Sequence, residues 1–213
     1  MSSLRQQAYE AIKHKIVTLQ LAPNSVIDES ALRQALNLGR TPIREALQRL
    51  QYDNLVTILP RRGMFVTEVS INDLPMLYES RVVLEAHIAE VAARRGSAEH
   101  WDEMDALLTI DVHSTDQDKL MTVDKRCHEI MFEAANNHFI TDTLVMLYAQ
   151  SHRLWHQYLS RVSHMTQAIN EHKLICNALR AGNGALASEL VEKHVRAFQA
   201  EIQAVMMDEL LLK

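Results

Sequence analysis

The chain has few of the residues that interrupt helices or build turn-rich sheets. Its 213 residues include five glycines and four prolines, and aromatic side chains make up 5% of the total. This composition disfavours a sandwich of many short strands and favours helices. The two cysteines, Cys127 and Cys176, exclude a disulfide framework and are more typical of buried small apolar side chains.

Long apolar segments are also missing. No run approaches the roughly 18 apolar residues that a membrane-spanning helix needs, and the first residues do not resemble a signal peptide. We therefore expect a cytoplasmic protein without a membrane partner. With 47% hydrophobic and 23% charged residues, the chain is typical of globular proteins, and its length allows one large or two small domains.

Charge is distributed unevenly along the chain, whose net charge is −5. Residues 1–69 contain nine Lys or Arg and six Asp or Glu, whereas residues 70–213 contain thirteen and twenty-one. A cationic first third beside an acidic remainder is typical of a protein whose first part meets a polyanion.

The cationic first third predicts three helices and a hairpin. Apolar residues every three or four positions indicate a helix over about 4–19, and a second helix begins near Asp28 and closes at Asn37-Leu-Gly39. Thr41-Pro42 is typical of a helix start, with Thr41 as the cap and Pro42 at the first helical position. Strand-like alternation then predicts a hairpin over 56–58 and 64–69.

Arginine and glutamine side chains recur on the outer face of the third predicted helix. Two helices joined by a short turn, with the second presenting such side chains, are typical of a helix-turn-helix that enters the major groove. The hairpin tip Arg61-Arg62-Gly63 would form a wing. In isolation, each of Arg40, Arg44 and Arg49 is more typical of a solvated surface residue, but the combination of capped helix, turn, hairpin and charge favours DNA binding.

These residues resemble the winged helix-turn-helix of the GntR family of bacterial transcription regulators. The resemblance covers about residues 5–69 and is most specific in Arg40-Thr-Pro-Ile-Arg-Glu-Ala-Leu. It implies that Arg40, Thr41 and Arg44 contact operator DNA, with Gly63 at the wing tip. Many members have an arginine where this chain has Ser30, which implies a different preference at the base that this arginine would touch.

From residue 70 onward the pattern is helical, and four ionisable residues occupy apolar positions. Asp124 and His128 lie one turn apart on the inner face of a helix near 116–136. His172 and His194 lie on the inner faces of the last two predicted helices, 166–181 and 184–210. Each is eleven residues from the turn near residue 183, so in an antiparallel hairpin both would lie roughly 16 Å from it, at the same level.

One carboxylate and three imidazoles suit a divalent transition ion such as Zn, Ni, Fe or Mn. A lone buried histidine is more often a hydrogen-bonded core residue, but four aligned ionisable residues favour a metal site. His152 and His156 also have ligand-like spacing, although their helix has a core stripe that favours packing. Cys176 is a conceivable ligand, but a buried thiol is the stronger interpretation.

Residues 73–213 resemble the all-helical FCD effector domain of the FadR-type branch of this family. The resemblance is carried by Asp73-Leu-Pro-Met-Leu-Tyr-Glu-Ser-Arg-Val-Val-Leu-Glu, Asp124-Lys-Arg-Cys-His, Glu171-His-Lys and Glu192-Lys-His-Val. Many members bind a metal through one Asp and three His, which match Asp124, His128, His172 and His194. Arg81, on an apolar stripe, could bind an effector carboxylate, as the resemblance implies, or pair with Glu85.

The sequence thus predicts a mainly α protein with two domains. Residues 1–69 would form a winged helix-turn-helix of three helices and a small β-hairpin, and residues 70–213 an all-α antiparallel bundle for effector binding and dimerisation. We expect a homodimeric repressor that binds double-stranded operator DNA and responds to a small carboxylate, an organic or sugar acid, at a metal-containing pocket. The alternatives are a regulator that senses the ion itself and a metal-dependent hydrolase.

Overall fold

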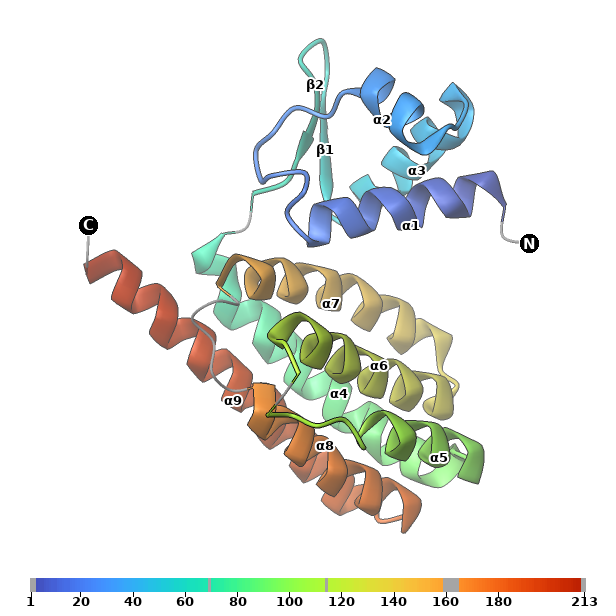
Figure 1. Ribbon diagram of the computed structural model, residues 1–213, viewed down its shortest axis with the longest axis vertical. Helices are drawn as coiled ribbons and strands as arrows, with labels where there is room; N and C mark the ends of the chain where they lie inside the picture. The colour runs from blue at the N-terminus through green and yellow to red at the C-terminus, as the bar shows by residue number, and fades with distance from the viewer. Residues whose placement is uncertain (1–2, 69, 114, 159–164, 212–213) are drawn as a thin grey trace. The chain divides into compact units, whose positions relative to one another are not determined.

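The computed structural model describes residues 3–68, 70–113, 115–158 and 165–211. Contacts between residues divide the chain into two compact units (Figure 1). One unit contains Met1–Ser70 with Tyr148–Gln157, and the other contains Ile71–Leu147 with Tyr158–Lys213. Within the described ranges, no helix is both long and apolar enough to cross a membrane.

The first unit begins with a winged helix-turn-helix, which confirms the predicted fold class. Its elements are α1 (Leu4–Val17), α2 (Glu29–Leu36), α3 (Arg40–Tyr52), β1 (Val56–Leu59) and β2 (Gly63–Val66). Helix α1 ends at Val17, earlier than predicted, because the Thr18 hydroxyl donates to the carbonyl of His14 and Leu19 turns to a left-handed φ of 59°.

The turn between α2 and α3 has the expected left-handed residue but a different helix start. Asp28 caps α2 by accepting hydrogen bonds from two backbone N–H groups, and Asn37 ends it with a φ of 51°. Gly39, not Thr41, is the N-cap of α3. As a glycine it has no side chain with which to cap the helix. Pro42 therefore occupies the third helical position, where an N–H would still have no intrahelical partner.

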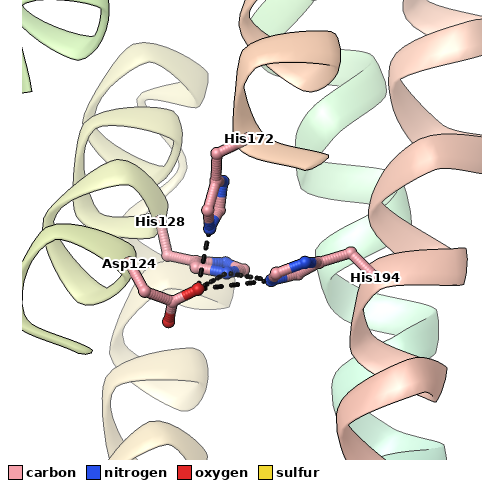
Figure 2. A group of neighbouring side chains, drawn as sticks. All are labelled: Asp124, His128, His172 and His194. Atoms are coloured by element: carbon pink, nitrogen blue, oxygen red, sulfur yellow. Dashed lines mark hydrogen bonds and ion pairs between the residues drawn. The ribbon is translucent and has the colours of Figure 1, made fainter. Parts of the chain in front are cut away.

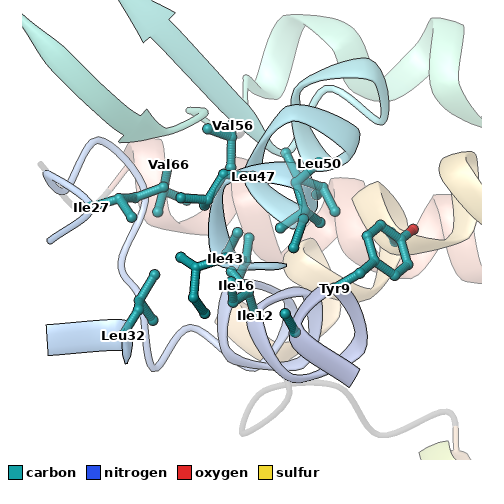
Figure 3. Packing of buried hydrophobic residues seen from close by; sticks show 14 residues of the cluster. Tyr9, Ile12, Ile16, Ile27, Leu32, Ile43, Leu47, Leu50, Val56 and Val66 are labelled. Carbon is teal, nitrogen blue, oxygen red and sulfur yellow. The ribbon is translucent and has the colours of Figure 1, made fainter. Parts of the chain in front are cut away.

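The hairpin is antiparallel, with Val56 opposite Val66 and Leu59 opposite Gly63. The first strand ends one residue later than predicted, at Leu59, and the second begins one residue earlier, at Gly63, and ends three residues earlier, at Val66. Beyond Val66 the Thr67 hydroxyl donates to the carbonyl of Asn54. Figure 3 shows apolar side chains from the helices and both strands meeting in one core. Labelled there are Tyr9, Ile12, Ile16, Ile27, Leu32, Ile43, Leu47, Leu50, Val56 and Val66.

The helices and strands assigned in the described residues of the second unit are all helices, joined by short turns and loops. After a short 3-10 turn, η1 (Ile71–Asp73), its elements are α4 (Leu74–Arg95), α5 (Ala98–Leu107), α6 (Gln117–Ala135), α8 (Met165–Arg180) and α9 (Gly184–Leu211). Helix α7 (His138–Tyr158) has residues in both units. The sequence pattern predicts this helix over 139–160, and residues 159–160 lie outside the described residues. Helix α4 packs against α6, α8 and α9, and α8 also packs against α6 and α9.

The turn between α8 and α9 determines how the C-terminal hairpin is aligned. Gly182 has a positive φ of 68°, and the side chain of Asn183 accepts a hydrogen bond from the backbone N–H of Leu186 in the first turn of α9. The two helices thus reverse direction at the predicted turn. Residues equally distant from the turn, such as His172 and His194, can therefore meet.

Candidate metal centre and nucleic-acid interface

Three helices of the second unit bring Asp124, His128, His172 and His194 together (Figure 2). Asp124 and His128 lie one turn apart on α6, His172 lies on α8 and His194 on α9. All four are buried, with exposed fractions between 1% and 6%. The structure therefore brings into one group the four residues for which the sequence predicts metal binding.

The donor atoms converge on a small volume. Asp124 Oδ1 lies 2.8 Å from His172 Nε2, 3.4 Å from His194 Nε2 and 3.9 Å from His128 Nε2. The Nε2 atoms of His128 and His194 are 3.2 Å apart, and one ligand atom from each of the four residues lies within 4.8 Å of the others. A tetrahedral ion at about 2.0–2.1 Å would hold its ligand atoms roughly 3.4 Å apart, so the group fits a transition ion.

Two members of the group, Asp124 and His172, already have the protonation states that metal ligation needs. Burial alone would raise the pKa of the Asp124 carboxyl, but hydrogen bonds with His172 and His194 hold that pKa well below its ordinary value. Burial and the neighbouring His194 lower the pKa of His172 to about 4. At neutral pH Asp124 is therefore ionised and His172 neutral, and these are the forms that bind a metal.

One buried carboxylate, Glu85, and one half-buried carboxylate, Glu171, lie behind the histidines, on the side away from the convergence point. Glu85 Oε2, from α4, lies 2.8 Å from His128 Nδ1, and Glu171 Oε2, from α8, lies 2.8 Å from His194 Nδ1. Burial lowers the pKa of His194, but its bonds to Asp124 and Glu171 more than offset this effect and raise the pKa to about 9. The sequence analysis missed the roles of both glutamates, although Glu171 directly precedes His172.

Arg81 is paired with Glu85, one of the two roles considered for it. The Arg81 Nε to Glu85 Oε1 distance is 2.6 Å, and the exposed fractions are 5% and 0%. Burial alone would raise the pKa of Glu85, but the charge of Arg81 and the contact with His128 outweigh it and lower the pKa to about 2. Glu85 is therefore an anion inside the bundle.

The other conceivable ligands lie outside the group of four. Cys176 is buried, and its Sγ lies 3.3 Å from Asp105 Oδ1. His152 is 8% exposed, with its ring centroid 5.2 Å from that of Tyr148. These contacts agree with the packing interpretation of both residues.

The six residues for which the sequence predicts DNA contact are all exposed: Arg40, Thr41 and Arg44 on α3, and Arg61, Arg62 and Gly63 at the hairpin tip. Arg44 donates to Glu29 through Nε at 3.0 Å and Nη2 at 3.4 Å. Both bonds use one edge of the guanidinium, so its outer edge remains able to meet a base. Gly63 has a φ of 105°, a conformation that favours glycine.

Arg49 has a different environment although it lies on the same helix. Its guanidinium carbon is 3.8 Å from the centroid of the Tyr9 ring, and its Nη1 donates to Gln6 at 2.8 Å. Tyr9 in turn donates to Asp53 at 2.6 Å. Arg49 thus joins α1 to α3, whereas Arg44 contacts Glu29 at the start of α2.

Two sequence profiles match the chain. Residues 76–197 match the FCD domain, and residues 4–66 match the bacterial regulatory proteins of the gntR family. Among curated proteins, the HTH-type transcriptional repressor RspR of Escherichia coli strain K12 is 22% identical over 205 residues, covering 95% of this chain and 90% of RspR. The repressor GlaR of the same strain is 26% identical over 200 residues, covering 88% and 90%.

Solved structures agree with this fold. Escherichia coli McbR/YncC has a TM-score of 0.85 at 20% identity, covering 96% of this chain and 99% of that one. A GntR transcriptional regulator described as putative, from Rhodococcus sp. RHA1, has a TM-score of 0.73 at 22% identity, covering 95% and 99%. The two-part architecture is therefore the same in all three proteins.

Proposed function

Because the chain belongs to the FCD-domain branch of the gntR family of bacterial transcription regulators, we propose that it is a homodimeric repressor controlled by a small carboxylate. The protein is a regulator and not an enzyme, so the hydrolase alternative is set aside. One observation carries the proposal: the same chain presents exposed arginines on α3 and encloses an Asp/His group between α6, α8 and α9.

In this proposal residues 1–69 read the operator in the cytoplasm. Arg40, Thr41 and Arg44 would enter the major groove, where arginine can donate two hydrogen bonds to a guanine edge. Arg61 and Arg62 would contact phosphates beside it. Gly63 would let the hairpin backbone turn there without the strain of a side chain. Phosphate contacts contribute affinity without sequence information, so specificity would depend mainly on α3.

Residues 70–213 would bind the effector and hold two protomers together. Asp124, His128, His172 and His194 would hold a divalent transition ion such as Zn, Ni, Fe or Mn. The bound ion would supply open coordination positions for the carboxylate oxygens of an organic or sugar acid. An effector that binds more tightly to the arrangement of DNA-binding domains with low operator affinity would weaken operator binding. Operator binding would then lower effector affinity by the same factor.

The number of protein ligands supports a second candidate function. Four ligands complete a tetrahedral site, and structural zinc sites are closed in this way. With a tetrahedral ion, the signal would be the ion itself. With an ion of higher coordination number, positions remain for the carboxylate.

The proposed homodimer has a two-fold axis, and this predicts a two-fold symmetric operator. A duplex selected by the wild-type protein from a random library should be an inverted repeat that binds two chains, because a two-fold dimer presents two copies of α3. Sedimentation of the complex measures the stoichiometry, and an unrelated duplex at the same salt concentration is the control. An asymmetric site that binds one chain would contradict the proposal.

A further inference from the structure

We propose that Glu85 and Glu171 are positioning residues that orient His128 and His194 toward the candidate ion, and that Arg81 acts through Glu85 instead of binding the effector. This inference rests on the proposed metal centre. It assigns a role to three buried or half-buried charged groups that are not themselves in the group of four candidate ligands.

The first step concerns which ring nitrogen carries the proton. A neutral imidazole has one N–H, and a carboxylate can only accept. Glu171 Oε2 and His194 Nδ1 form a hydrogen bond at 2.8 Å, and Glu85 Oε2 lies at the same distance from His128 Nδ1 as an ion pair. In the neutral, metal-binding form of each ring, the adjacent carboxylate therefore favours the tautomer with its proton on Nδ1. The Nε2 lone pairs of His128 and His194 then point toward Asp124, where Figure 2 shows the rings converging.

The second step concerns the helices that supply these groups. Glu85 on α4 contacts His128 on α6, and Glu171 on α8 contacts His194 on α9. Each glutamate thus holds a histidine of a different helix. Ring orientation therefore depends on how α4, α6, α8 and α9 pack, and is not left to free rotation of the side chains.

The third step concerns charge. Asp124, Glu85 and Glu171 bring three negative charges to the site, and Arg81 brings one positive charge. With the three histidines neutral, as metal ligation requires, the balance is −2, which a divalent cation would neutralise, and His194 would release its second ring proton as the ion binds. Buried charges are costly unless they are paired. Arg81 is 5% exposed and uses its Nε to pair with Glu85, so its position on an apolar stripe is explained without a ligand.

Helix α4 offers a matched control. Glu90 and Arg94 are also four residues apart and paired, at 2.5 Å, but their side chains are 42% and 58% exposed. Glu90→Gln therefore removes the same charge, from the same helix and the same type of ion pair, away from the metal centre.

The test measures ion binding by the full-length protein with Zn²⁺, Ni²⁺, Mn²⁺ and Fe²⁺ at fixed pH. Wild type should bind one ion per chain. Glu85→Gln and Glu171→Gln should each weaken binding by about 10- to 100-fold, as substitutions behind a ligand do, whereas Glu90→Gln should not. Arg81→Met should weaken binding in the wild type but have little further effect in the Glu85→Gln variant.

Each outcome has a defined meaning. If wild type binds none of the four ions, the proposed metal centre is wrong. If wild type binds an ion and both glutamine variants bind it equally well, only the positioning role is wrong. If Arg81→Met weakens binding of organic acids but not of the ion, Arg81 is an effector residue.

A spectroscopic measurement on wild type keeps the inference testable if the variants do not fold. Proton–nitrogen correlation spectra of the histidine rings report which nitrogen is protonated. We expect an Nδ1 proton on His128 and His194 in the ion-loaded protein. Coordination through Nδ1 in either ring would overturn the proposal.

Discussion

Replacing Arg44 by alanine should weaken binding to the selected operator by about 10- to 100-fold, because a guanidinium that donates two hydrogen bonds to one base contributes that much discrimination. Its side chain is 49% exposed, and Glu29 holds it by one edge. Side-chain freedom is thus already restricted before DNA arrives. Fluorescence anisotropy of a labelled operator at fixed salt concentration measures the loss.

The same helix provides the control for this prediction. Arg49→Ala removes an equal charge, but Arg49 lies over the Tyr9 ring and donates to Gln6, so operator affinity of the folded variant should change little. Arg44→Lys should not restore binding, because lysine lacks the planar fork. If Arg44→Ala weakened binding to operator and unrelated duplex equally, Arg44 would be a phosphate contact and not a reader of sequence.

Replacing both His172 and His194 by alanine should remove the stoichiometric ion. Only Asp124 and His128 would remain as ligands, one turn apart on α6. Complete structural zinc sites contribute roughly 10–16 kcal/mol, so losing half the ligands should weaken binding by roughly 10³-fold or more. Elemental analysis after dialysis measures the ion content per chain.

The control for this second prediction is His152→Ala. His152 is also buried, 8% exposed, but packs beside Tyr148 and outside the group of four. Its replacement should leave the ion content at one per chain. An unchanged ion content in the His172→Ala/His194→Ala double variant would refute the assignment of ligands.

Periodic features of the chain were predictable from sequence because they depend on local spacing. Asp124 and His128 are four residues apart, which places them on one face of any helix. His172 and His194 are equally distant from the turn at Gly182 and Asn183, so a hairpin brings them level. Sequence spacing therefore predicts that Asp124, His128, His172 and His194 lie in one group.

Features that depend on packing between helices were not predictable in this way. The sequence allows two roles for Arg81, and the structure shows one of them, the ion pair with the buried Glu85, which also contacts His128. Glu171 was missed because its partner His194 lies on another helix. The residue type of Thr41 predicts a helix cap at that position, whereas the turn geometry makes Gly39 the cap.

Joint control of the operator by an acid and an ion can be measured by retardation of the selected operator across a panel of organic and sugar acids, at fixed salt, for ion-loaded and chelator-treated protein. We expect at least one acid to release the operator from the ion-loaded protein and to fail to do so after chelation. Operator binding that no acid alters, or release that is equally strong without the ion, would contradict this expectation. Binding that follows the ion alone would favour the metal-sensing alternative.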